Sequence, residues 1–162
     1  MSGKKQSGGT ATWRIGLMGV LIAFVSMVTG CASVPLASTE TDAARKRFDP
    51  PTEEKAGVYV YRTSSIGQAL KKTVCVDEIP LGRTAPNTYF YIEVDPGKHT
   101  VSTESEFGYN SLDFIADAGV NYFFEQYLKM GIFVGGANVK AVSQEKGKAE
   151  VLKCKLAQGF SK

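Results

Sequence analysis

The sequence is poor in the residues and motifs that usually carry out chemistry. It contains a single histidine, His99, and lacks Gly-x-Ser-x-Gly, His-Glu-x-x-His and Gly-Lys-Ser/Thr segments. These absences exclude the common hydrolase, zinc-protease and phosphate-loop signatures. General-base use of His99 would also need a nucleophile and an orienting carboxylate brought close by folding. Because His99 directly follows a Pro-Gly turn, we expect it to be a half-exposed strand residue.

The body of the chain also lacks an excess of positive charge. The formal net charge is +3, but Lys4, Lys5 and Arg14 all lie in residues 1–30, which contain no acid. The remaining residues hold 16 basic against 16 acidic side chains. A nucleic-acid surface needs clustered, uncompensated Lys and Arg, so this balance argues against nucleic-acid binding. An apolar content of 43% excludes a disordered or collagen-like chain, and 162 residues suffice for one domain.

A short apolar run near the amino terminus ends at a cysteine. Residues 1–14 are polar and cationic, residues 15–29 are almost wholly apolar, and Gly30-Cys31 follows. A basic region before a short apolar stretch that ends in small residues is typical of a secretory signal. A membrane-spanning helix needs about 20 apolar residues, which makes an uncleaved signal anchor the less favoured alternative.

Val28-Thr29-Gly30-Cys31 resembles the bacterial lipobox, with Val28 where leucine is usual. The resemblance implies cleavage before Cys31, a diacylglycerol on its thiol and a further acyl chain such as palmitate on the new amino group. Each buried methylene contributes about 0.8 kcal/mol, so two or three chains hold a protein on a membrane almost irreversibly. No Asp follows the cysteine, which by the same resemblance implies the periplasmic side of the outer membrane. The alternative is a buried or disulfide-bonded Cys31.

Residues 31–55 contain three prolines and show no strand alternation. They predict a lipidated cysteine followed by a flexible tether of about 24 residues, with an end-to-end distance of roughly 25–30 Å. A short helix over residues 41–47 is the alternative, stopped by Pro50-Pro51.

Residues 56–162 alternate between apolar and polar side chains in short segments separated by Pro and Gly turns. The pattern predicts an all-β, mainly antiparallel β-sandwich of about seven short strands. One short helix over residues 143–152, capped by Ser143, is also expected. The polar strand over residues 99–106 is expected near a sheet edge. The other expected strands cover residues 57–62, 72–77, 88–94, 110–117, 120–129, 139–142 and 153–157.

Several short motifs resemble a bacterial lipoprotein family known only as domain of unknown function 2846. They are YVYR at 59–62, TYF at 88–90, PGKH at 96–99 and KCKL at 153–156. The resemblance covers roughly residues 56–157 and implies a β-rich envelope lipoprotein without an established activity. Members often have an Asp-Gly turn where this chain has Asp77-Glu78. A Glu at positive φ is strained, so we expect a different turn, or a longer loop that ends at Gly82.

Beyond Cys31 the chain has two cysteines, Cys75 and Cys154. In an oxidising periplasm such a pair tends to form a disulfide, which here would close a loop of about 79 residues and contribute roughly 4–5 kcal/mol. The alternative is two separate buried thiols that behave as small apolar side chains. Neither cysteine has a His or a second Cys at metal-ligand spacing, so catalytic or metal-binding thiols are less favoured.

Two groups of side chains are candidates for partner binding. The first is a set of alternating tyrosines, which form either core and rim residues or an exposed stripe suited to sugar rings: Tyr59, Tyr61, Tyr89 and Tyr91. The second is the glycine-rich segment 131–137, which forms either an apolar turn or an exposed loop that presents Ile132, Phe133 and Val134 to lipid or protein.

Acidic residues in the middle of the chain lack the spacing of a calcium loop, so a solvated face is expected and no metal or cofactor is assigned: Glu104, Glu106, Asp113 and Asp117. The sequence therefore favours a membrane-anchored periplasmic lipoprotein that works as a non-catalytic binding or envelope-assembly module. A module that contacts peptidoglycan or other glycans through an exposed tyrosine stripe is the alternative. An envelope enzyme is the least favoured hypothesis.

Overall fold

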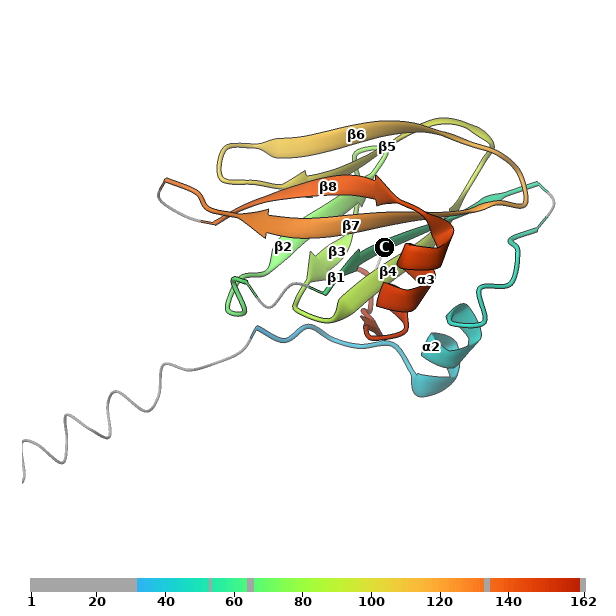
Figure 1. Cartoon of the computed structure of the whole chain (residues 1–162), viewed down its shortest axis with the longest axis horizontal. Coiled ribbons are helices and arrows are strands. Elements are labelled where there is room, and N and C mark those ends of the chain that lie inside the picture. Colours follow the sequence, from blue (N-terminus) through green and yellow to red (C-terminus); the bar gives the residue numbers. More distant parts are fainter. Residues whose placement is uncertain (1–31, 53, 64–65, 133–134, 161–162) are drawn as a thin grey trace, which may run out of the picture. The chain divides into compact units, whose positions relative to one another are not determined.

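The computed structural model describes residues 32–52, 54–63, 66–132 and 135–160. These residues form a sandwich of two β-sheets with two short helices (Figure 1). The prediction of an all-β sandwich is therefore confirmed, with nine strands in the described part rather than about seven. The helices are α2 (Thr39–Arg45) and α3 (Gln144–Val151). The strands are β1 (Ala56–Arg62), β2 (Lys72–Val76), β3 (Ile79–Thr84), β4 (Thr88–Val94), β5 (Gly97–Glu104), β6 (Tyr109–Ala116), β7 (Asn121–Lys129), β8 (Gly136–Val142) and β9 (Lys155–Leu156).

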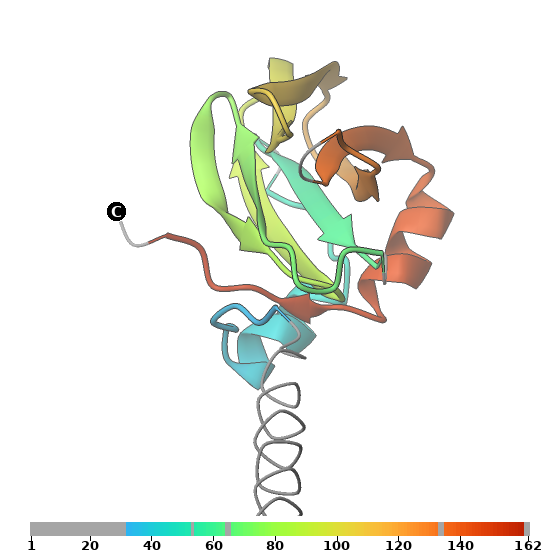
Figure 2. The same cartoon turned by 90° about the vertical axis from the view of Figure 1, so that its left-hand side faces the viewer.

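The two sheets differ in size and in strand direction. One has five strands in the order β8-β7-β1-β4-β9, and the other has four in the order β3-β2-β5-β6. All pairs in the smaller sheet are antiparallel, whereas β1 with β7 and β4 with β9 are parallel in the larger one. The polar strand β5, expected near a sheet edge, lies between β2 and the edge strand β6. Neither described helix covers the outer face of this sheet (Figure 2), which agrees with the polar residues that alternate along β5.

Alternate residues of both sheets point into the space between them. Val58 and Val60 of β1, Val74 of β2 and Val101 of β5 are fully buried in one cluster. Burying such a side chain contributes about 1.5–3 kcal/mol, so this inner layer is the main source of stability.

A polar bridge crosses the same inner layer. Gln126 of β7 is fully buried, and its Nε2 donates to Oγ1 of Thr103 at 2.6 Å. Its Oε1 accepts a hydrogen bond from Thr84 of β3. Because a buried amide without partners is costly, these two bonds fix how the sheets face each other.

The β2–β3 hairpin corrects one sequence expectation. Asp77 and Glu78 form its two-residue turn with φ values of 50° and 66°, a geometry that matches the right-handed twist of the flanking strands. Sequence reasoning rejected this turn because of Glu78 and so missed β3. Pro80 is accommodated because β3 is an edge strand, and a β-bulge lies beside it.

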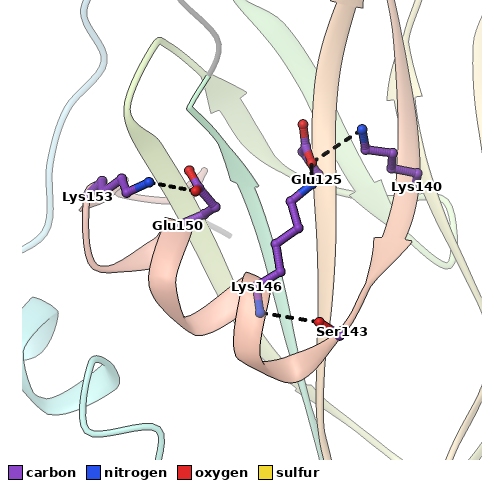
Figure 3. A network of polar contacts seen from close by, with 6 residues as sticks. All are labelled: Glu125, Lys140, Ser143, Lys146, Glu150 and Lys153. Atoms are coloured by element: carbon purple, nitrogen blue, oxygen red, sulfur yellow. Dashed lines mark hydrogen bonds and ion pairs between the residues drawn. The ribbon is translucent and has the colours of Figure 1, made fainter.

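Helix α3 packs on the larger sheet, as Figure 2 shows. Ser143 is its N-cap as predicted, with Oγ accepting from the Lys146 amide at 3.3 Å. Glu125 of β7 accepts from Lys146 at 2.8 Å and forms an ion pair with Lys140 at 3.4 Å (Figure 3). These contacts connect the helix to both strands of the β7–β8 hairpin.

The segment expected to be a flexible tether is instead part of the fold. Residues 32–52 run along the sandwich before β1 (Figure 1). The Ala37 amide donates to the Leu156 carbonyl at 2.9 Å, and the Gln158 amide donates to the Pro35 carbonyl at 2.9 Å. The short helix is present, as α2. Among the described residues, no helix is long and apolar enough to cross a membrane.

Candidate functional site

The predicted tyrosine stripe lies on the outer face of the larger sheet, and most of it is covered. Tyr59, Tyr61 and Tyr89 are at most 1% exposed and belong to a second apolar cluster. The ring of Phe123 stacks on Tyr59 with centroids 4.8 Å apart, and Phe48 packs against both rings. Burial raises the pKa of Tyr59 to about 12. The interpretation as core residues is therefore confirmed, and the exposed stripe is wrong.

Tyr91 lies at the rim of this cluster and is half-buried. The guanidinium of Arg45 stands 4.2 Å from its ring centroid, and its hydroxyl donates to Oε1 of Glu93 at 2.8 Å. Both contacts come from the protein itself, so the ring offers little free face to a sugar. The alternative of a glycan platform on these tyrosines loses its structural basis.

A buried aspartate fastens α2 over the tyrosine cluster. Oδ1 of Asp42 accepts from the Leu156 amide at 2.9 Å, and Oδ2 accepts from Lys46 Nζ at 2.8 Å. Lys46 Nζ also donates to the Cys154 carbonyl at 2.5 Å. Burial alone would raise the pKa of Asp42, but the bonds from Lys46, Tyr89 and the Leu156 amide outweigh it and lower the pKa. Sequence reasoning did not identify Asp42, although an acid in the first turn of a helix was a usable signal.

The two cysteines lie on opposite sides of the molecule, so the predicted disulfide is wrong. Cys75 of β2 alternates with Val74 and Val76, which face the inner core, and therefore points to the outer face of the smaller sheet. Cys154 lies in the tyrosine cluster outside the larger sheet. Both sheets separate the two thiols, and both are free. Burial raises the pKa of Cys154 to about 12, which makes it an unreactive thiol.

His99 is held on both ring nitrogens. Nδ1 lies 2.6 Å from Oδ2 of Asp77, and Nε2 lies 2.6 Å from the carbonyl oxygen of Asp95. Both neighbours are acceptors, so the arrangement is satisfied best when both nitrogens carry a proton. Burial alone would lower the pKa of His99, but the hydrogen bonds to Asp77 and Asp95 outweigh it and raise the pKa. The histidine therefore clamps the β2–β3 turn and has no nitrogen left to accept a substrate proton.

The predicted acidic residues each have a local partner. Glu104 accepts from the Thr73 amide and hydroxyl, and Asp113 forms an ion pair with Lys98 at 2.8 Å. Oδ2 of Asp117 accepts from the Tyr122 hydroxyl, and Glu106 accepts from the Ile132 amide. In the described ranges, no three metal-binding side chains gather in one place.

The uncovered face of the smaller sheet holds a pocket of about 450 Å³. Its lining is rich in hydroxyl groups and includes one thiol: Cys75, Glu78, Pro80, Thr100, Ser102, Tyr109 and Ser111. A pocket of this volume is in the usual range for small-molecule sites, and, as in such sites, its lining is mostly apolar with a few polar groups, here hydroxyls and one carboxylate. Sequence reasoning did not identify this pocket, although the alternating hydroxyl residues of β5 and β6 were a usable signal.

Of the remaining predicted site residues, Ile132 is described by the structure and is exposed, and the others lie outside the described residues. Ile132 is 81% exposed, as the loop hypothesis requires, whereas Phe133 and Val134 lie outside the described residues. The expected signal-peptidase residues Val28, Thr29 and Gly30 and the expected lipidation site Cys31 also lie outside them.

A family profile described as "Protein of unknown function (DUF2846)" matches residues 52–137, more than half of the chain. The chain belongs to the DUF2846 family. An uncharacterized protein of Haemophilus influenzae is 42% identical over 137 residues, which cover 85% of this chain and 82% of that protein. No solved structure matches. The DUF2846 match runs from before β1 to the start of β8, and thus includes the pocket strands but neither helix.

Proposed function

We propose that this DUF2846 protein is a lipid-anchored lipoprotein of the bacterial envelope, placed on the periplasmic side of the outer membrane. In this proposal it works as a non-catalytic binding or envelope-assembly module. The anchor is supported by the basic region, the short apolar run and the Val28-Thr29-Gly30-Cys31 motif. The observation that carries the binding role is the uncovered outer face of β3, β2, β5 and β6 with its hydroxyl-lined pocket.

The chemistry of the described side chains favours binding over catalysis. His99 has acceptors on both ring nitrogens, and Cys154 is buried with a raised pKa. A general base needs a free nitrogen or carboxylate near its proton, and a nucleophilic thiol needs a lowered pKa. The pocket combines a mostly apolar lining with hydroxyls and one carboxylate, Glu78, which suits recognition of a partner surface that presents both apolar and polar groups.

Replacing the expected lipidation site tests the anchor. Cys31→Ser should move the protein from the sedimented membranes to the soluble fraction, because the acyl chains would have no attachment. Cys75→Ser is the matched control, since Cys75 lies on the sheet, and that variant should stay with the membranes. Retention of Cys31→Ser in the pellet would refute the anchor.

A photo-crosslinking side chain placed in the pocket tests the binding role. At Ser111, which lines the pocket, it should capture a discrete envelope component in intact cells. The same group at Glu145, an exposed residue of α3, is the control and should not capture it. Ser102→Trp should fill the pocket and abolish the Ser111 product. Identical products from both positions would contradict the assignment of this face.

A further inference from the structure

One end of the sandwich carries the most exposed large apolar side chains of the described residues. Met130 is 93% exposed, Ile132 is 81% exposed and Phe107 is 74% exposed. Met130 and Ile132 follow β7, and Phe107 lies in the loop between β5 and β6. The two loops touch, because the Ile132 amide donates to Oε2 of Glu106 at 2.8 Å. Single exposed apolar residues are ordinary, but a group of them at one end indicates a contact surface.

The loop between β1 and β2 completes this end and is held by a buried arginine. Arg62 is fully buried, and its guanidinium donates to the carbonyl oxygens of Leu70 at 2.7 Å and Gly67 at 2.8 Å. A third bond at 3.4 Å reaches the carbonyl of Ile66, whose side chain is 64% exposed. These bonds hold residues 66–70 against the end of β1. The exposed side chain of Ile66 is thus held in place before any partner binds.

The proposed anchor leads directly into this end. The amide of Ala32 donates to the carbonyl of Gln68 at 2.9 Å, within the loop that Arg62 holds. In the proposed mature lipoprotein only Cys31 precedes Ala32, and one peptide link spans about 3.8 Å. Acyl chains on Cys31 would thus start beside the exposed apolar side chains. Because residues 32–52 are packed on the sandwich, no tether separates the domain from the lipid.

We infer that Ile66, Phe107, Met130 and Ile132, which we name the apolar tip, insert into the boundary between headgroups and acyl chains of the bilayer that holds the anchor. This inference rests on the proposed lipid anchor. Exposed Lys71 and Lys129 adjoin two of the tip loops in the sequence. Their charge suits anionic headgroups, as expected for an interfacial contact.

Insertion of the apolar tip orients the whole domain. The strands β1, β5 and β7 all end at the tip, and the Asp77–Glu78 turn lies at the far end of β2. The sandwich then stands on the membrane with its strands directed away from the surface. The pocket face is turned sideways, where it is open to a second envelope component.

A tryptophan placed in the apolar tip reports the contact. The single tryptophan of the sequence, Trp13, lies in the predicted signal peptide, so the processed protein has no other indole. The processed, acylated Ile132→Trp protein is reconstituted in phosphatidylethanolamine–phosphatidylglycerol vesicles with brominated acyl chains. Its emission should shift to the blue and fall by about twofold or more upon bromination. Ile115→Trp, at a site 71% exposed on β6, is the matched control and should do neither.

The outcomes separate the tip from the anchor. Intact mass is measured first on the same samples, and Phe107→Trp serves as a second reporter if Ile132→Trp does not fold. With the acyl mass present, equal and small quenching at the Ile132 and Ile115 positions would overturn the tip inference and leave the anchor standing. With the acyl mass absent and Trp13 retained, the proposed anchor fails and the inference fails with it.

Discussion

Asp42 offers the sharpest test of how the segment before β1 is attached. Its carboxylate accepts one hydrogen bond from the Leu156 amide and one from Lys46, and the residue is 9% exposed. Hydrogen bonds to a buried charged group contribute about 1.5–3 kcal/mol each, and a lost partner leaves a donor unsatisfied. Lys46 keeps its bond to the Cys154 carbonyl. Asp42→Ala should therefore lower the free energy of unfolding by about 3 kcal/mol.

The assay is urea unfolding followed by circular dichroism, with limited tryptic digestion as a second measurement. Asp49→Ala is the control, because its ion pair with Arg47 is exposed and worth less than about 1 kcal/mol. Trypsin should cut Asp42→Ala faster than the control after Arg45, Lys46 and Arg47, since α2 is released. A loss below about 1 kcal/mol with unchanged digestion would show that the segment is a free tether after all.

Asp42 also predicts a dependence on pH. The lowered pKa means that its stabilising contribution is present above the ordinary carboxylate pKa and is lost as pH falls through the folded-state pKa. The difference in unfolding free energy between wild type and Asp42→Ala should thus shrink in strong acid. A difference that stayed constant down to about pH 2 would contradict the charged network.

Three further predictions follow from the fold. The pKa of His99 is raised in the folded protein, so its contact with Asp77 contributes full stability below about pH 6.5, the ordinary pKa of histidine. This contribution is lost as pH rises through the higher, folded-state pKa. Urea unfolding at several pH values should show this loss in the wild type and not in His99→Gln. Gly147→Ala should lower the free energy of unfolding by about 1–3 kcal/mol, because the new Cβ would lie 2.2 Å from a ring carbon of Phe123. This clash should outweigh the better helix propensity of alanine. Equal or higher stability in thermal melts would contradict the packing of α3 on Phe123. In denaturant without reductant, thiol titration of the processed protein should find both Cys75 and Cys154 free. A count of titratable thiols near zero would instead support the disulfide.

Most of the strands could be predicted because alternation reflects a physical constraint. Val58 and Val60 had to share one face of β1, and Tyr59 and Tyr61 the other. What alternation does not show is whether each face is covered. The tyrosine face is buried by Phe48 and α2, which precede β1, and by α3 near the other end of the chain, and the alternation within a strand shows none of them. The same gap explains why the pocket on the smaller sheet was not predicted.

The missed elements depend on tertiary contacts or on strained backbone. The β2–β3 turn uses Asp77 and Glu78 at positive φ, and His99 from β5 helps to hold Asp77 there. The strain of a Glu at positive φ can be foreseen from the sequence, but the contact from His99 that helps to hold the turn cannot. Residues 32–52 resemble a tether in composition, but Asp42 finds its partner in Leu156 near the other end of the chain. Pairings at such a sequence separation require the folded structure.

The anchor at Cys31 is the central claim, and the intact mass of the protein extracted from cell membranes tests it most directly. The account predicts a chain that starts at Cys31 and carries the mass of a diacylglycerol and a further acyl chain. A mass that includes residues 1–30, or a chain with an unmodified Cys31, would contradict it.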